Sequence, residues 1–264
     1  MVGLNIIVCL KQVPGTTEVE IDPKTGRLKR EGVAAVVNPF DEYAVEEAIR
    51  IKEKLSGRIK VLSMGPPMAE TALRDALALG CDEAWLATDR VFGGADTLAT
   101  SYTLGLCIKK IAPFELIICG LKTTDGDTGQ VGPEIAENLG IPHICYVNKI
   151  LDISESKIKV TRMLDDGVET VESSLPALIT VTKEINQPRL ATLMGKLRAT
   201  KAEIRKITAA DVGGDPNRFG ALGSATRVIK VTTPPPPLGG EVVKGSPDEL
   251  AERILQKLIE CKII

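Results

Sequence analysis

The feature that most constrains the fold is a polar, glycine-rich loop between a short apolar run and a predicted helix. The apolar run 116–119 stops at Gly120, and the loop that follows holds two aspartates and two further glycines. Residues 131–139 then show a helical pattern that ends at Gly140. The free N–H groups and the dipole of a helix N-terminus favour an anion. The loop therefore predicts a nucleotide phosphate site, although its spacing matches neither the Rossmann nor the Walker A pattern.

The first 140 residues alternate strand and helix patterns, which predicts a parallel sheet covered by helices on both faces. Expected strands are 4–10, 59–64, 84–87 and 114–119, and expected helices begin at Asn38 and span 69–79, 96–111 and 131–139. Asn38 is a candidate helix cap, because Pro39 suits the first helical position. Ligands of such sheets bind beyond the carboxyl ends of the strands.

The pattern changes after Gly140. Segments 157–164 and 168–174 predict a β-hairpin, and 178–182 predicts a further strand. Residues 184–210 are polar and basic and are interpreted as a linker or arm, and an amphipathic helix is expected over 248–259. We therefore expect an α/β domain over residues 1–185 and an arm over 186–264 that lies on a partner subunit.

Composition narrows the function classes. The 33 basic and 35 acidic residues give a net charge of −2, and only 3% of residues are aromatic, so nucleic acid is not expected as a partner. No apolar run reaches the ~20 residues of a membrane span. The six cysteines and the single histidine show no metal-ligand spacing. These features predict a cytoplasmic protein with reduced cysteines and no metal centre.

Several segments together give the chain a resemblance to the beta subunit of an electron transfer flavoprotein. They are Val8–Val13, Asn38–Ala48, Ser63–Pro66, Gly120–Pro133, and Val160–Val171 with the strand that follows it. The resemblance is spread over most of the first 181 residues, and the order and spacing of the segments carry it. It implies the three-layer, adenine-nucleotide-binding α/β sandwich of that family. It also implies an alpha subunit that carries FAD.

The resemblance also implies where the nucleotide lies. The expected cofactor-binding residues are Cys9, Asn38, Phe40, Asp41, Met64, Thr123, Thr124, Asp125, Gly126, Asp127, Thr128, Gln130, Val131, Gly132 and Pro133. No catalytic side chain is expected, because the flavin supplies the chemistry. Asp125 and Asp127 can be read equally as solvated turn residues or as partners of ribose or backbone.

The loop resembles the bifurcating type of the family more than the respiratory type. Glycine at positions 126 and 132 removes side-chain bulk and is interpreted as room for a diphosphate. In the bifurcating type, FAD in this subunit accepts a hydride from NADH and sends electrons to ferredoxin or flavodoxin and, through the alpha FAD, to an acyl-CoA dehydrogenase. The alternative is a respiratory type that binds AMP structurally.

The arm resembles the family's recognition loop, and Leu193, with Arg189 nearby, is expected to dock an acyl-CoA dehydrogenase.

A function from another class, ATP hydrolysis or ATP binding on a related fold, remains open. An ATP pyrophosphatase would carry a Ser-Gly-Gly-x-Asp-Ser loop after the first strand, where this chain has Lys11-Gln-Val-Pro-Gly.

Overall fold

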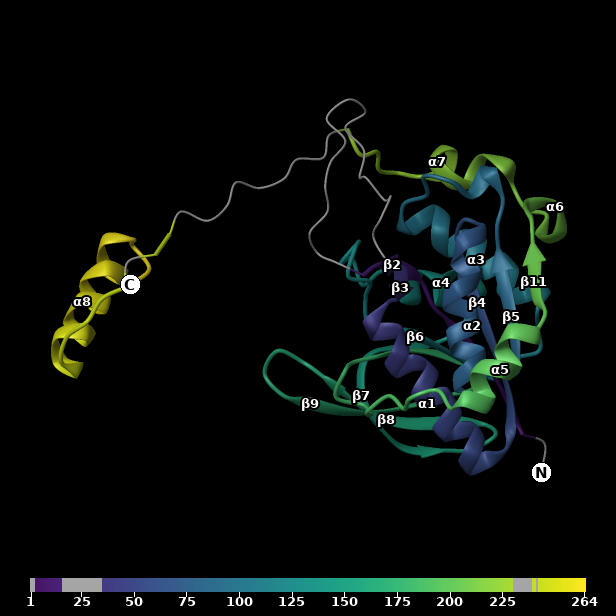
Figure 1. Ribbon diagram of the computed structural model, residues 1–264, viewed down its shortest axis with the longest axis horizontal. Helices are drawn as coiled ribbons and strands as arrows, with labels where there is room; N and C mark the ends of the chain where they lie inside the picture. The colour runs from purple at the N-terminus through teal and green to yellow at the C-terminus, as the bar shows by residue number, and fades with distance from the viewer. Residues whose placement is uncertain (1–2, 16–34, 230–238, 241) are drawn as a thin grey trace.

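A mixed nine-stranded sheet forms the centre of the molecule, and helices pack on both of its faces (Figure 1). The computed structural model describes residues 3–15, 35–229, 239–240 and 242–264. The strands are β1 Leu4–Cys9, β2 Gln12–Pro14, β3 Ala35–Val37, β4 Gly57–Met64, β5 Glu83–Ala87, β6 Leu116–Gly120, β7 His143–Ile153, β8 Lys157–Met163, β9 Val168–Ser174, β10 Ala177–Val181 and β11 Ile204–Ile207. The α-helices are α1 Pro39–Leu55, α2 Glu70–Leu79, α3 Thr97–Lys110, α4 Val131–Leu139, α5 Leu193–Lys201, α6 Ala209–Val212, α7 Gly220–Gly223 and α8 Pro247–Glu260. Short 3-10 turns lie at Pro67–Ala69, Arg90–Phe92 and Pro216–Arg218.

The strand order is β11-β5-β4-β1-β6-β10-β7-β8-β9, and every pairing from β11 to β7 is parallel. The chain leaves β1 on one side to form β4 and β5, and returns on the other side of β1 to form β6. The strand order therefore reverses between β1 and β6. Their carboxyl ends flank the crevice where open α/β sheets bind ligands.

Two apolar cores hold the three layers together, one on each face of the sheet. The larger core packs α1, α2 and Ala199 of α5 against residues such as Ile6, Val8 and Ile118. The other core packs α3 and α4 against residues such as Ile7 and Ile117. Neighbouring residues of one strand thus enter opposite cores, which is why the central strands are apolar along their whole length. The three-layer α/β sandwich expected from the sequence is confirmed.

The predicted hairpin is present and lengthens the main sheet. Strands β8 and β9 pair antiparallel over the predicted residues, and β8 pairs with β7. Strand β7 is not among the elements expected from the sequence. Register shifts in its pairing, together with a positive φ of 62° at Tyr146, break the alternation of buried and exposed residues that marks a strand.

The segment after residue 185 is packed on the sheet domain rather than irregular. Helix α5 lies on α2, where the Arg74 guanidinium donates to the Ala199 carbonyl at 2.7 Å. Strand β11 then becomes the edge of the sheet beside β5. Farther on, Phe219 packs in the second core, and the Asp96 carboxylate accepts from the Thr226 N–H at 2.9 Å. The chain therefore leaves the domain only after Thr226.

The C-terminal helix α8 stands apart from this body (Figure 1). It matches the predicted amphipathic helix, begins at a Ser246–Glu249 capping box and has no buried residue. Among the described residues, none of the helices combines the length and the apolar character that crossing a bilayer requires.

Candidate functional site at the strand ends

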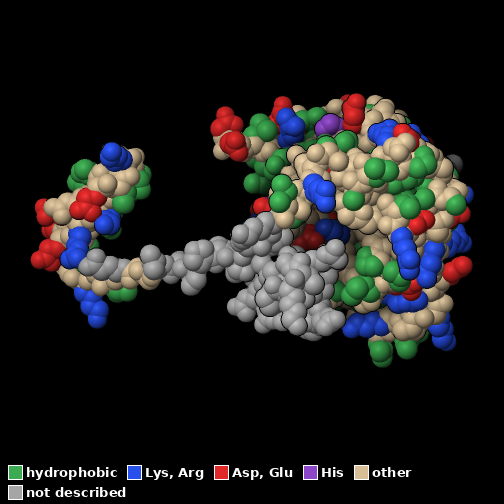
Figure 2. Space-filling view, turned by 90° about the horizontal axis from the view of Figure 1, so that it is seen from above, with side chains coloured by type: hydrophobic (Ala, Val, Ile, Leu, Met, Phe, Trp, Pro, Cys, Tyr) green, Lys and Arg blue, Asp and Glu red, His purple; other side chains and the backbone are tan. Residues whose placement is uncertain are grey.

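The predicted nucleotide residues gather where β1, β4 and β6 end. Cys9 is the last residue of β1, pairs in register with Cys119 of β6, and lies opposite Leu62 of β4. Met64 is the last residue of β4 and is half-buried. Figure 2 looks onto this edge and shows acidic and basic side chains close together in a hollow. The side chains of Cys9, Cys119 and Met64 belong to the core below α3 and α4. Cys9 therefore presents mainly its backbone to the edge.

Asn38 ties the glycine-rich loop to the start of α1. Its side chain makes no helix-capping bond, which corrects the capping role inferred from the sequence. Instead, its amide nitrogen donates to the Lys122 carbonyl at 2.9 Å, and its oxygen accepts from the Thr124 N–H at 3.2 Å. The side chain is fully buried. Asn38 therefore sets the position of the loop, and its own N–H and carbonyl are bonded to Lys11 and Asp41.

Asp41 performs the same task for the ends of β1 and β6. Its carboxylate accepts from the Lys11 N–H at 2.7 Å and from the Gly120 N–H. Burial raises the pKa of Asp41 to about 7, against the lowering effect of these hydrogen bonds and of the Lys11 charge. A Cβ at Gly120 would lie 2.7 Å from the Phe40 carbonyl carbon, so glycine lets α1 begin directly beside β6.

The loop itself is a tight turn with most of its side chains in solvent. The Asp127 N–H donates to the Thr123 carbonyl at 2.8 Å, and Asp127 has a positive φ of 53°. Thr124, Asp125, Gly126 and Thr128 are exposed. Local hydrogen bonding makes Asp one of the residues that tolerates this left-handed conformation.

Two lysine–aspartate pairs connect the loop to its surroundings. The Lys11 ammonium contacts both Asp125 carboxylate oxygens, at 2.8 and 2.9 Å. The Lys122 ammonium lies 2.7 Å from an Asp127 oxygen and 5.9 Å from the centre of the Phe40 ring. Partial burial raises the pKa of Asp125, but the hydrogen bonds and charge of Lys11 outweigh this and hold it below its usual value. Neither aspartate is arranged as a general base.

Helix α4 begins at the loop without a side-chain cap. By contrast, α3 and α8 begin at capping residues Asp96 and Ser246. Gln130 occupies the cap position of α4. Its side-chain oxygen instead accepts from the Thr97 hydroxyl of α3 at 3.3 Å. Pro133 has no N–H and the Glu134 N–H donates to the Gln130 carbonyl at 3.0 Å, so the first turn of α4 can offer the N–H groups of Val131 and Gly132 to an anion.

Gly132 in this first turn has a packing role that the sequence reading did not identify. A Cβ there would lie 2.6 Å from Cγ2 of Thr180 in β10 and 3.7 Å from Cβ of Cys119. Glycine is thus required for α4 to lie close on the sheet, so its lack of a side chain is no evidence for a longer diphosphate. At Gly126 the nearest contact of a Cβ would be the Thr123 hydroxyl, at 3.2 Å.

These residues fit a nucleotide phosphate. The uncapped α4 terminus, the exposed turn and the two ammonium groups supply donors on several sides of one edge. Ser63, directly before Met64, is fully buried, and its hydroxyl has no hydrogen-bond partner. No group of three or more histidine, cysteine or acidic residues among the described parts of the chain has metal-binding geometry.

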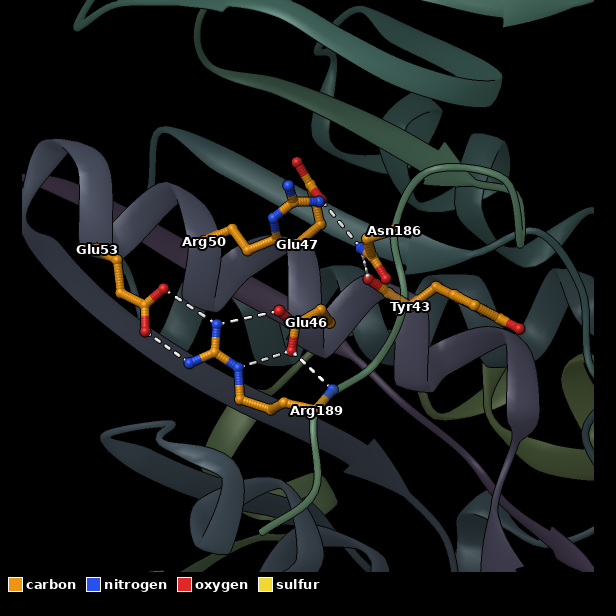
Figure 3. A network of polar contacts seen from close by, with 7 residues as sticks. All are labelled: Tyr43, Glu46, Glu47, Arg50, Glu53, Asn186 and Arg189. Carbon is orange, nitrogen blue, oxygen red and sulfur yellow. Dashed lines mark hydrogen bonds and ion pairs between the residues drawn. The ribbon is translucent and has the colours of Figure 1, made fainter. Parts of the chain in front are cut away.

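The second predicted site, the loop before α5, is fixed to α1 by Arg189 (Figure 3). The guanidinium contacts Glu46 at 2.8 and 3.0 Å and Glu53 at 2.6 and 3.0 Å. Asn186 donates to the Tyr43 carbonyl and to Glu47 nearby. Because both edges of the guanidinium are bonded within the chain, Arg189 acts first as the anchor of the loop.

Apolar side chains project into solvent directly after this anchor. Leu190 is 92% exposed, Leu193 74%, Met194 73% and Leu197 52%. We call these four residues the leucine patch. Leu193 was expected from the sequence, whereas Met194 and Leu197 join it because they lie in α5, and Leu190 lies in the loop just before this helix. Lys11 and Thr97 were also not expected at the site from the sequence, although Lys11 directly follows the apolar run 4–10.

The fold and this edge define an α/β sandwich protein with hydrogen-bond donors gathered at the reversal of its strand order. A model of the electron transfer flavoprotein domain matches residues 25–212. The chain is 47% identical to an electron transfer flavoprotein subunit beta of Thermoanaerobacterium thermosaccharolyticum, over 97% of this chain and 98% of the relative. It is 44% identical to subunit CarD of the caffeyl-CoA reductase-Etf complex of Acetobacterium woodii, over 99% and 100%. It is 42% identical to protein FixA of Azotobacter vinelandii, over 97% and 94%.

The chain belongs to the electron transfer flavoprotein family, in which it corresponds to the beta subunit. The resemblance drawn from the sequence is thereby confirmed. Its general role is electron transfer.

Proposed function

We propose that this subunit binds FAD at the strand-end site and, with an alpha subunit, takes part in electron bifurcation. In this function NADH would supply a hydride whose two electrons are separated, one going to ferredoxin or flavodoxin and the other, through the alpha FAD, to an acyl-CoA dehydrogenase. The flavin supplies the redox chemistry when bound, and the protein sets its position and surroundings. The observation that carries the proposal is the donor-rich edge formed by β1, β4, β6 and the uncapped start of α4.

The roles of individual residues follow from their contacts. Asn38 and Asp41 hold the loop, the start of α1 and the end of β1 in one arrangement. The Thr124 and Asp127 N–H groups are bonded within the chain, so phosphate oxygens are offered the other N–H groups of the loop and those of Val131 and Gly132 in α4. Cys9, Phe40 and Met64 border the same edge and contribute apolar surface and backbone. A relative named as part of a caffeyl-CoA reductase complex supports a role beside an acyl-CoA-type oxidoreductase.

Structural binding of AMP is the second candidate. It is favoured by the contact of Gly132 with Thr180, because this packing explains the glycine without a diphosphate. A site that only holds AMP needs the same phosphate donors and the same fixed loop. Electrons would then pass only through the alpha FAD.

Cofactor content of the purified heterodimer distinguishes the two candidates. The chain is co-expressed with its alpha subunit, the complex is denatured, and released FAD and AMP are separated and quantified. Two FAD per heterodimer without AMP support the bifurcating function. One FAD with stoichiometric AMP contradicts it and supports the structural role.

The leucine patch is proposed as the docking surface for the acyl-CoA dehydrogenase. Leu193→Ala removes an exposed apolar anchor, so the KM for the dehydrogenase in the coupled assay is expected to rise about tenfold or more. Leu222 of α7 is 72% exposed elsewhere, and Leu222→Ala serves as the matched control. Equal KM values for the Leu193 variant and the wild type would contradict this role.

A further inference from the structure

Lys11 is the basic residue most firmly placed at the strand-end site. It lies two residues after the end of β1, the central strand at which the strand order reverses. Its N–H donates to Asp41 at 2.7 Å, and its carbonyl accepts from the Asn38 N–H at 2.8 Å. The backbone is therefore fixed on both sides, and only the side chain is free to reorient.

The Lys11 ammonium reaches across the edge to the glycine-rich loop. It contacts both carboxylate oxygens of Asp125, while the two side chains remain 45% and 33% exposed. Exposed ion pairs of this kind are weak, because water competes and two flexible side chains must be held still. An ammonium has three donors and binds phosphate well as a point charge. A phosphate group at the loop can therefore take the ammonium from Asp125.

Lys122, the other lysine of the site, is less well placed than Lys11 to bind a phosphate group. Lys122 lies over the Phe40 ring, and its partner Asp127 has a side chain that is 68% exposed. Its pair lies within the loop, whereas the Lys11–Asp125 pair joins the loop to the central strand. Of the two, the Lys11–Asp125 pair alone spans the edge that the loop and β1 enclose.

We propose that Lys11 binds a phosphate group of the nucleotide, and that Asp125 competes with this phosphate for the Lys11 ammonium. The proposal rests on the proposed function, because it requires a nucleotide at this edge. It makes Lys11 a binding residue for the phosphate and gives Asp125 an opposing role. Removing Asp125 should then strengthen phosphate binding, which a residue that contacts ribose or supports the fold would not do.

Isothermal titration of the nucleotide-depleted heterodimer with AMP, ADP and adenosine tests the proposal. Lys11→Gln is expected to weaken AMP and ADP binding about tenfold, as loss of one charge-assisted contact does, and to leave adenosine binding unchanged. Asp125→Asn is expected to tighten AMP binding by up to about fivefold. In the Lys11→Gln background, Asp125→Asn should have little further effect, because the two residues act on the same ammonium.

Lys157→Gln is the matched control. Lys157 forms an exposed pair with Glu172 at 3.3 Å on the hairpin, away from the strand-end edge. Equal AMP affinity for wild type and Lys11→Gln would overturn the inference while leaving nucleotide binding intact. So would an equal loss of AMP and adenosine affinity, which indicates a purely structural role. If the wild type bound no adenine nucleotide, the proposed function would fail first.

Discussion

At the scale of the residue, the site is organised by buried polar side chains that bond to backbone. Asn38 and Asp41 are 0% and 5% exposed, yet they connect α1 to the ends of β1 and β6 and to the glycine-rich loop. Buried polar groups of this kind are costly unless they are bonded. Their contacts fix the start of α1, the end of β1 and the glycine-rich loop in one arrangement. The precision of the edge therefore depends on residues that a ligand hardly touches.

Asp41 should make stability depend on pH. Below about pH 4 the folded and unfolded states both hold the proton, because the usual pKa is 3.8 and the folded pKa is about 7. As pH rises toward 7, the unfolded chain loses this proton first, so the Asp41 contribution to stability falls by up to ~4 kcal/mol. In Asp41→Asn this change is absent. Urea unfolding of both proteins at several pH values between 4 and 8 measures it.

The expected result is a difference in unfolding free energy, wild type minus variant, that decreases steadily from pH 4 to pH 7. Asp152→Asn replaces an exposed carboxyl of β7 and serves as the surface control. A wild-type minus Asp41→Asn difference that stays constant over this range would contradict the linkage.

At the scale of the element, how much the sequence predicts depends on how regular each pattern is. Helix α4 has the predicted bounds, and the hairpin pairs over the predicted residues, because apolar periodicity and turn glycines agree there. Helix α5 was not expected from the sequence, because Gly195 near its start is typical of a loop. A Cβ at Gly195 would collide with the Ala78 carbonyl oxygen of α2, so the glycine records a tertiary contact that no local pattern shows.

The candidate site shows the same limit. Its position at the carboxyl ends of parallel strands follows from the α/β pattern alone. Which side chains face a ligand does not follow, because Asn38 turns from the expected cap toward Lys122 and Thr124. Lys11 and Asp125 are 114 positions apart in sequence, and only the folded sheet brings them together.

The packing of α4 on β10 makes a prediction that separates it from nucleotide binding. Gly132→Ala should lower stability by about 1–3 kcal/mol, because its Cβ would overlap Cγ2 of Thr180. Thr180→Ser removes that methyl group and keeps the hydroxyl that accepts from the Tyr146 N–H at 3.2 Å. The double variant should therefore recover part of the lost stability. Thermal unfolding of the full chain without added nucleotide measures the effect.

If Gly132 served only to make room for a ligand, Gly132→Ala would unfold like the wild type in that measurement. Gly167→Ala at the hairpin tip is the matched control, since nothing lies within 4 Å of its added Cβ. Thr180→Ser alone reports the cost of the lost methyl contact.

The loop that carries the leucine patch should depend on Arg189. Arg189→Gln removes the bidentate contacts with Glu46 and Glu53, of which Glu46 is nearly buried with a side chain 7% exposed. Losing ~1–2 kcal/mol of charge-assisted hydrogen bonding should speed amide exchange in residues 186–192 about tenfold. Hydrogen-exchange mass spectrometry measures this, with Arg162→Gln in the exposed hairpin pair as control. Unchanged exchange in the loop would show that it is held by other contacts.

At the scale of the whole molecule, the chain after residue 185 first closes around its own sheet and then departs from it. It covers α2 with α5, extends the sheet with β11, and reaches the cap of α3 at Thr226. Beyond this point, α8 exposes Ile254 at 62%, Leu255 at 50% and Ile259 at 56%. Figure 2 shows hydrophobic and charged side chains side by side on this separate helix. An amphipathic helix without a core of its own is suited to bind a groove on a partner.

The alpha subunit is the expected partner of α8, and the prediction separates binding from folding. Because α8 has no buried residue, Ile254→Ser with Leu258→Ser should leave the thermal unfolding of the chain alone unchanged. The same pair of substitutions should weaken its affinity for the alpha subunit at least about tenfold, because two apolar anchors are lost. Gln256→Ser, on the opposite side of the helix, controls for changes in helix propensity. Sedimentation of labelled chain with increasing alpha subunit measures the affinity. Equal dissociation constants for the double variant and the wild type would assign this helix another partner.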